Sequence, residues 1–405
     1  MITVLEHAAE LPAEWDEVVG DNLYLRRDFL AFMETCEDCR QRYHLVWDAA
    51  GRLDTVFMTY VRDHYNLAMF TPRRYEVTMT FVYVPLSVTR PGIAWGSCRD
   101  EALAYIRGIR GYSMLLNLPP GDYPGFATGL TCPKCILDVQ WPTFDAYLAG
   151  LRSHYRNRYT KALRRSAGLR LRWLDDNSEF DESLYGLYEQ VYDHSALKIE
   201  KLPISFFRGP FFRILVLEDD EGPQGFVQFL PNDDELIFEF VGFNYATNRT
   251  YDTYLRLLLE IVRYGIDEGY STIDFGQTAD DTKLKLGAQY TMLYAALHHS
   301  NPVVHAIGKM LAPALQYTPI TTDFQVFRAA ESSALRDVTA PERGDSSGNR
   351  HEQHRVPDEQ PRDAAAHTRV PEEQPGEAAA HTWVPEEQPG EAPLRLEGPT
   401  TEDAA

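Results

Sequence analysis

Apolar and polar positions recur with two different periods along the first 330 residues, and the period changes at turn residues. Stretches with a two-residue period, such as 55–61 and 225–230, are typical of half-buried strands. Stretches with a period of three to four residues, such as 100–109 and 251–267, are typical of amphipathic helices. The order hairpin, strand, helix, strand, strand occurs twice. This pattern predicts an α/β (α+β) fold of two tandem domains of similar layout, each with a mixed sheet.

The repetition divides the folded part of the chain near Trp141-Pro142. We expect an N-terminal domain over residues 1–141 and a C-terminal domain over residues 142–330. At the start of the second domain, residues 144–165 are predicted to form one long helix. Residues 303–315 predict another helix, which we expect to pack into the core. A surface-seeking amphipathic helix is the alternative interpretation of this last segment.

Residues 331–405 have a different composition, with Trp383 as their single aromatic residue. A unit containing Val-Pro, an acidic pair, Gln and Pro recurs every 14 residues, at Val356, Val370 and Val384. Two prolines in each unit prevent a continuous helix, and one valine in each unit cannot form a core. The segment is therefore interpreted as a disordered, acidic, Pro/Glu-rich tail. A linear motif that docks a protein partner is the alternative.

The 405 residues carry a net charge of −21, of which the tail contributes −10. Such a charge argues against a protein that coats nucleic acid through its overall charge. No run of 18 apolar residues and no secretory signal is visible, which predicts a cytoplasmic protein without a membrane span.

One segment reverses this acidic balance, because no acidic residue lies between Asp145 and Asp175. It predicts a surface for an anionic partner such as a phosphate, a nucleotide or a tRNA end; a solvated basic face paired with acids elsewhere is the alternative. Its basic residues are Arg152, Arg156, Arg158, Lys161, Arg164, Arg165, Arg170 and Arg172.

Four of the five cysteines form two Cys-x-x-Cys pairs, Cys36 with Cys39 and Cys132 with Cys135. Two such pairs among five cysteines indicate a structural zinc site in the first domain, since a reducing cytoplasm disfavours disulfides. The 92 residues between the pairs require the fold to bring them together. Buried free thiols are the alternative.

The second half resembles a known family. Residues 269–276 read Gly-Tyr-Ser-Thr-Ile-Asp-Phe-Gly, and residues 283–287 read Lys-Leu-Lys-Leu-Gly. Together with the basic helix at 155–165, this order resembles the FemAB-like and CelD-like branch of the GNAT acyltransferases, over roughly residues 145–300.

The resemblance implies two tandem GNAT-like domains and transfer of an acyl or aminoacyl group to an amine of a small molecule or peptide. Relatives use acyl-CoA or aminoacyl-tRNA as the donor. Standard members hold the CoA pyrophosphate on a glycine-containing turn at a helix start. Residues 244–250, at the matching place, contain no glycine, which leaves the donor open. A non-catalytic GNAT-like binding module that docks partners through its tail is the alternative.

Acyl transfer needs a base, a carbonyl polariser and an acid. Glu239, on an aromatic strand, is the candidate base; Asp274 ends a strand; Lys285 is the candidate polariser; and Tyr294 is the candidate proton donor. The structural alternatives are a solvent-facing strand residue, a loop cap, a surface lysine and a core tyrosine. No nucleophilic triad is evident, which favours direct attack without a covalent intermediate. The candidate donor- and substrate-binding residues are Arg156, Arg158, Lys161, Arg164, His194, Lys198, Gly276 and Gln277.

Overall fold

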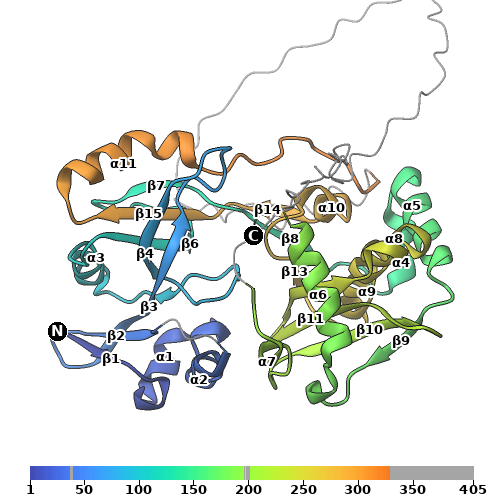
Figure 1. The fold of residues 1–405 in the computed structure, drawn as a ribbon, viewed down its shortest axis with the longest axis horizontal. Helices are drawn as coiled ribbons and strands as arrows, with labels where there is room; N and C mark the ends of the chain where they lie inside the picture. Colours follow the sequence, from blue (N-terminus) through green and yellow to red (C-terminus); the bar gives the residue numbers. More distant parts are fainter. Residues whose placement is uncertain (37–39, 196, 198–200, 329–405) are drawn as a thin grey trace, which may run out of the picture. The chain divides into compact units, whose positions relative to one another are not determined.

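The computed structural model describes residues 1–36, 40–195, 197 and 201–328 (Figure 1). All of these residues belong to one compact unit. The predicted tail, Cys39 and Lys198 lie outside the described residues.

An eight-stranded sheet is built mainly from the first half of the chain, in the order β1-β2-β3-β4-β6-β15-β7, with β5 paired to β3. Its strands are β1 (Ile2–Leu5), β2 (Arg42–Trp47), β3 (Leu53–Asn66), β4 (Glu76–Val82), β5 (Ile93–Ala94), β6 (Tyr112–Leu118), β7 (Ala127–Leu130) and β15 (Tyr294–His299). The helices of this part are α1 (Glu14–Val19), α2 (Arg27–Cys36), α3 (Arg99–Arg107) and α11 (Pro302–Leu315), with the 3-10 turns η1 (Ala8–Glu10) and η2 (Leu23–Leu25).

A seven-stranded sheet follows the order β14-β8-β13-β12-β11-β10-β9. Its strands are β8 (Lys134–Asp138), β9 (Arg170–Trp173), β10 (Arg213–Asp219), β11 (Gly222–Asn232), β12 (Glu235–Phe243), β13 (Thr272–Asp274) and β14 (Gln289–Thr291). The helices here are α4 (Phe144–Gly150), α5 (Ser153–Arg165), α6 (Glu182–His194), α7 (Ile204–Phe207), α8 (Tyr245–Tyr251), α9 (Thr253–Asp267) and α10 (Asp280–Lys285), with the 3-10 turn η3 (Asn177–Glu179).

Each sheet contains one parallel strand pair at the corresponding place. Strands β4 and β6 are parallel and are joined through α3, whereas β12 and β13 are parallel and are joined through α9. A parallel connection needs a crossover segment, and the amphipathic helices predicted between these strands supply it. The other strand pairs are antiparallel, so the predicted fold class of two mixed sheets is confirmed.

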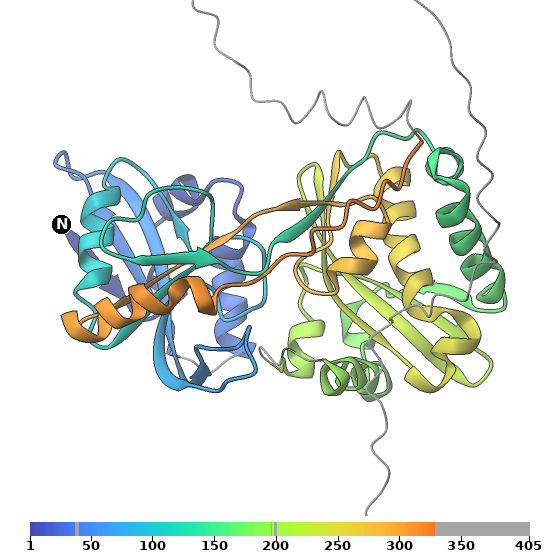
Figure 2. The ribbon, with the colours of Figure 1, turned by 90° about the horizontal axis from the view of Figure 1, so that it is seen from above.

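The two sheets exchange one strand in each direction. Strand β8, from the first half, pairs antiparallel with β13, and β15, from the second half, pairs antiparallel with β6. In Figure 2 the orange strand β15 accordingly lies among the blue and teal strands of the first half. A boundary at residue 141 therefore does not separate the strands of the two sheets, because each half completes the sheet of the other.

One hydrophobic core also contains residues from both halves. Phe29 of α2 packs edge-on against Phe212 with ring centroids 6.4 Å apart, and Phe32 lies 5.9 Å from Phe206. Burial of such large aromatic surfaces is the main favourable term in folding, so the two halves stabilise each other.

Two helix predictions need correction. The helix expected over 144–165 is interrupted, because Leu151 and Arg152 are extended and pair with the returning chain at Phe327 and Val326. The helix expected in the core, α11, has no buried residue. None of the helices in the described part is long and apolar enough to cross a bilayer.

Candidate functional site

Glu239 is the extra residue of a β-bulge in β12. In the pairing with β11, Phe238 lies opposite Phe229 and Phe240 lies opposite Gln228, so that Glu239 has no counterpart. A bulge of this kind changes the direction of a side chain and is frequent beside active sites. Here the carboxylate of Glu239 accepts a hydrogen bond from the hydroxyl of Tyr24, which belongs to η2 in the first half.

Asp274 ends β13 and is completely buried. Its carboxylate accepts hydrogen bonds from Thr89 Oγ1 at 2.5 Å and from the Gly276 amide at 2.8 Å, and Lys134 Nζ lies 3.8 Å away. Burial raises the pKa of Asp274, and Lys134 and the two hydrogen bonds only partly oppose this shift. Asp274 is therefore a carboxyl group that retains its proton at a higher pH than an exposed aspartate does.

A third carboxylate, that of Glu235 at the start of β12, completes the group. It pairs with Arg90 at 2.5 Å. Burial is the main cause that raises the pKa of Tyr24 well above its ordinary value, and the charges of Glu239, Asp274 and Glu235 add to this shift. We refer to Glu235, Glu239 and Asp274 as the carboxylate cluster.

The carboxylate cluster is assembled from both halves of the chain. The carboxylates come from β12 and β13, whereas Tyr24, Thr89, Arg90 and Lys134 come from the first half. Among the three carboxyl groups, Asp274 has a raised pKa, mainly because it is buried. Titratable groups perturbed in this way are frequent at catalytic sites.

Lys283 of α10 is the buried lysine of this region. Its side chain donates from Nζ to the Gln277 carbonyl oxygen at 2.7 Å and lies 5.6 Å from the centre of the Phe238 ring. Burial lowers the pKa of Lys283, and the neighbouring Cys135, Asp280 and Asp274 oppose the shift.

Lys285, the residue predicted from the sequence, is placed differently. Its ammonium pairs with Asp281 at 2.6 Å and lies over the Phe324 ring. Of the two lysines, Lys283 is thus the one that lies beside Asp274. The sequence motif, a lysine shortly before Gly287, fits both residues. Which of the two lysines faces inward depends on the orientation of α10 in the folded protein.

Gly276 and Gln277 form the turn after Asp274. Gly276 has a φ of 70°, a conformation that glycine adopts without strain. Gln277 donates from Nε2 to Asn117 Oδ1 at 3.1 Å and also to the Cys132 carbonyl oxygen. The side-chain amide of Gln277 therefore connects the end of β13 to the first sheet. Its nitrogen, which was predicted to bind the donor or substrate, is already hydrogen-bonded within the protein.

The predicted anion-binding helix is α5. Arg156 and Arg158 are half-buried, Lys161 and Arg164 are exposed, and within the described ranges none of the four forms an ion pair. The neighbouring Arg165, by contrast, pairs with Asp252 at 2.9 Å. Arg170 and Arg172 pair with acidic residues that include Glu218, Glu179 and Asp220. The basic segment therefore divides into a neutralised end and a group of four cations, which we call the α5 cations.

The glycine-free segment before α9 forms a helix of its own, α8. Asp252 joins the two helices in the left-handed conformation with a φ of 53°. The side chain of Asn248 in α8 accepts the Tyr254 amide hydrogen at 3.0 Å. One backbone amide at the start of α9 is therefore already hydrogen-bonded within the protein. This adds to the effect predicted from the sequence, in which the lack of glycine keeps a phosphate from approaching the backbone closely.

Comparison with known proteins identifies the second half. Residues 150–284, about a third of the chain, match the family model described as acetyltransferase (GNAT) domain. The chain carries a GNAT domain. Glu239, Asp274 and Lys283 lie inside the matched segment, whereas Lys285 lies outside it.

Solved structures cover more of the chain at low similarity. L-PGS from Bacillus licheniformis is 11% identical, with a TM-score of 0.43, covering 70% of this chain and 90% of that chain. FemX is 10% identical, with a TM-score of 0.44 and coverages of 66% and 90%. A GCN5-related N-acetyltransferase from Kribbella flavida is 11% identical, with a TM-score of 0.37 and coverages of 73% and 71%. No curated protein matches.

Tyr294 does not join the site of the GNAT domain. It lies on β15 in the first sheet, opposite Leu118 and Leu130, and packs against the core around Leu103 and Ile106. The sequence predicted it as the proton donor of the C-terminal domain, with a core tyrosine as the alternative. The strand exchange removes it to the other sheet.

His194 ends α6 and is exposed. Its ring stacks on Tyr245 with centroids 3.9 Å apart, and Nδ1 donates to the Gln190 carbonyl oxygen at 2.7 Å. His194 and Lys198 were both predicted to bind the donor or substrate; α6 ends at His194, and Lys198 lies outside the described residues.

The predicted zinc site does not form among the residues that are described. Among the described residues, no group of three His, Cys, Asp or Glu side chains is suited to bind a metal. Cys39, one of the four predicted ligands, lies outside the described residues. Cys132 and Cys135 are buried free thiols near Lys283, and burial raises the pKa of each to about 12. Both are therefore neutral at physiological pH.

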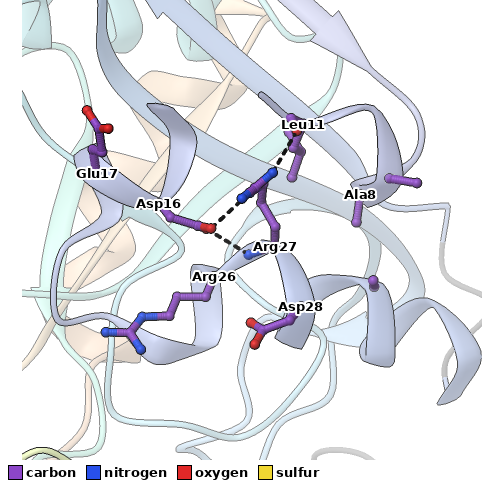
Figure 3. A pocket seen from close by; sticks show the side chains of 9 residues that line it. Ala8, Leu11, Asp16, Glu17, Arg26, Arg27 and Asp28 are labelled. Atoms are coloured by element: carbon purple, nitrogen blue, oxygen red, sulfur yellow. Dashed lines mark hydrogen bonds and ion pairs between the residues drawn. The ribbon is translucent and has the colours of Figure 1, made fainter. Parts of the chain in front are cut away.

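A hollow of about 730 Å³ opens in the first half, between η1, α1 and α2 (Figure 3). Across it Arg27 pairs with Asp16 at 2.8 Å and reaches the Leu11 carbonyl oxygen at 3.4 Å. This pairing satisfies the two charges within the protein. None of the residues predicted to act in catalysis or binding lines this hollow.

Proposed function

We propose that the protein is an N-acyltransferase that moves an acyl or aminoacyl group from an activated donor to an amine. The observation that supports this proposal most is the position of Glu239 at the bulge of a GNAT-domain strand, where it accepts a hydrogen bond from the buried Tyr24. A carboxylate that a bulge directs into a buried cluster is poised to accept a proton from an attacking amine.

Three side chains take the roles that the reaction requires. The amine nitrogen attacks the donor carbonyl while Glu239 accepts its proton. Lys283 polarises the carbonyl oxygen as negative charge develops on it, because a charge in a buried site interacts strongly. Asp274, with its raised pKa, supplies the proton that the leaving oxygen or sulfur takes when its bond to the acyl carbon breaks.

Direct attack is the mechanism that the thiols support. A cysteine nucleophile reacts as the thiolate, and a pKa of about 12 leaves Cys132 and Cys135 protonated at neutral pH. The acyl group therefore passes from donor to amine without an acyl-cysteine intermediate.

Two features favour aminoacyl-tRNA over acyl-CoA as the donor. The start of α9 lacks the glycine turn and is partly occupied by Asn248, which disfavours a pyrophosphate there. The α5 cations are free of carboxylate partners within the described residues, and they suit a polyanion. Binding of a charged tRNA should weaken steeply as salt rises, because each neutralised phosphate releases a counterion. A flat salt response would contradict this donor.

Transfer is measured with the full-length protein, a panel of amines, and either aminoacyl-tRNA or acyl-CoA as donor. Product is detected by mass. RNase should stop the reaction and removal of CoA should not. Glu239→Gln should abolish transfer, whereas Glu268→Gln, an exposed position at the end of α9, should leave it intact.

A non-catalytic binding module is the second candidate, and the partly occupied start of α9 favours it. Tight binding of aminoacyl-tRNA without product, unchanged by Glu239→Gln, would support the module and exclude the transferase.

A further inference from the structure

Helix α11 lies on the outer side of β7 and β15, as Figure 1 shows. Its inward side carries small residues: a methyl group at Gly308 would stand 4.0 Å from Leu297, and Gly129 of β7 approaches the Ala312 carbonyl oxygen. Gly308 thus lets the helix lie close to the sheet, and Val304, His305 and Leu315 are half-buried. None of its residues is buried.

The outward side of α11 carries large apolar side chains. Val303 is 67% exposed, Ile307 48%, Met310 73% and Leu311 44%. At about 100° per residue, these four positions span an arc of roughly 100°, and the exposed Ala306 and Pro313 beside them extend it to roughly 160° without a polar side chain. Contiguous exposed apolar surface of this kind marks an interaction site in a folded protein.

The segment of sequence that contains α11 is basic. From Thr282 to Thr322 the chain contains no acidic residue, although the whole sequence has 60. Lys309 borders the arc, and next to it His305 lies 4.5 Å from the ring of His298. Besides burial, the nearby cations Lys309 and Arg107 lower the pKa of these two histidines. The net charge of −21 acts weakly here, because salt screens charges beyond about 8 Å.

We propose that α11 binds the surface of a membrane that contains anionic lipid. The apolar arc enters the boundary between headgroups and acyl chains, while Lys309 contacts a lipid phosphate. With 14 residues the helix is roughly 21 Å long, which suits an orientation parallel to the surface and is too short to span.

Charge distinguishes this occupant from a second copy of the chain. A symmetric contact between two α11 helices places like surfaces together, so each cationic border meets the other. An anionic lipid surface instead supplies both the apolar phase and the opposite charge that this helix lacks. The observations therefore favour lipid.

The test is co-sedimentation of the full-length protein with vesicles made of equal parts of phosphatidylglycerol and phosphatidylcholine, against vesicles of phosphatidylcholine alone. Binding should be stronger to the anionic vesicles and should fall as salt rises. The double substitution Ile307→Glu with Met310→Glu should weaken binding at least about tenfold, because two charges then oppose insertion. Val61→Glu places the same charge on β3, where the side chain is 46% exposed, and should leave binding unchanged.

Thermal unfolding serves as the control for folding. The melting temperature should be the same for the wild type, the double variant and Val61→Glu, because every substituted side chain is exposed. A second readout is Met310→Trp, whose fluorescence should shift to shorter wavelength on the anionic vesicles. Equal loss of binding in Val61→Glu would overturn the proposal. Two other results would also overturn it. One is a wild-type protein that binds neither kind of vesicle. The other is a wild-type protein that does not bind vesicles but forms a concentration-dependent dimer, which the substitutions Ile307→Glu and Met310→Glu dissociate.

Discussion

Tyr24 donates its hydroxyl hydrogen to the carboxylate of Glu239, which lies 215 residues further along the chain. The donor belongs to a 3-10 turn of the first half and the acceptor to the bulge of β12 in the GNAT domain. This contact ties the candidate base to the opposite half, so its position depends on the fold of both.

Tyr24→Phe removes this donor while retaining the ring. We expect unfolding free energy to fall by about 2 kcal/mol, the value of a hydrogen bond to a charged group, and acyl transfer to fall with it. Urea denaturation and steady-state rates measure the two effects. Tyr105→Phe on the exposed face of α3 is the control and should change neither.

Lys283→Met and Lys285→Met separate the two lysines of α10. The first should reduce kcat by about a hundredfold, since it removes the group that polarises the carbonyl, without loss of stability, because a buried ammonium is costly to retain. The second breaks a partly exposed ion pair and should change kcat and stability little. The reverse order of the two kcat effects would restore Lys285 as the catalytic residue.

Gln228 lies on β11 opposite the bulge and is completely buried, and neither polar atom of its amide has a hydrogen-bond partner among the described residues. Unsatisfied buried groups of this kind cost about 1–3 kcal/mol each. Gln228→Met retains the shape and removes the polar atoms. We expect unfolding free energy to rise by about 1 kcal/mol, measured by chemical denaturation. A decrease would show that the amide is satisfied in solution.

Asp274→Asn tests the raised pKa of the buried carboxyl. A carboxyl whose folded pKa exceeds its unfolded pKa contributes stability at low pH and loses it as pH rises through the folded pKa. The stability of Asp274→Asn relative to wild type should therefore increase from about pH 4 upward, as unfolding curves at several pH values would show. A constant difference would mean that the carboxyl is not perturbed.

His44 predicts the opposite pH dependence in the first half. It is buried against Phe57 with rings 4.4 Å apart, and burial lowers its pKa from 6.5 to about 3. A depressed pKa contributes stability above 6.5 that is lost as pH falls, at about 1.4 kcal/mol per pH unit down to the folded pKa. His44→Phe removes the titrating group. The unfolding free energy of this variant should therefore fall less steeply than that of the wild type as pH decreases below 6.5. An unchanged slope would place the titration elsewhere.

The order of helices and strands could be predicted because hydrophobic periodicity is a local property. The amphipathic helix α9 and the hairpin of β10 and β11 are where their patterns indicated. Partners of strands are not local, however. Nothing in residues 294–299 indicates that they pair with β6 rather than with β13, so Tyr294 was assigned to the wrong sheet.

The site shows the same division. Glu239 and Asp274 stood out as acids among apolar neighbours, and both lie in the carboxylate cluster. Tyr24 gave no signal, because a buried tyrosine on a short turn has the pattern of an ordinary core residue. For α11 the sequence left core packing and a surface-seeking helix as alternatives, because amphipathic spacing shows that a helix has an apolar side but not whether that side is covered.

The strand exchange has a consequence for synthesis of the chain. While the first half emerges from the ribosome, β6 has an open edge on the side that β15 later occupies. Strand β8 likewise lacks its partner β13 until the second half has been made. An open edge pairs readily with strands of other chains. The nascent protein must protect this edge until almost 300 residues have been made, so neither half should be obtainable as an independent folded fragment.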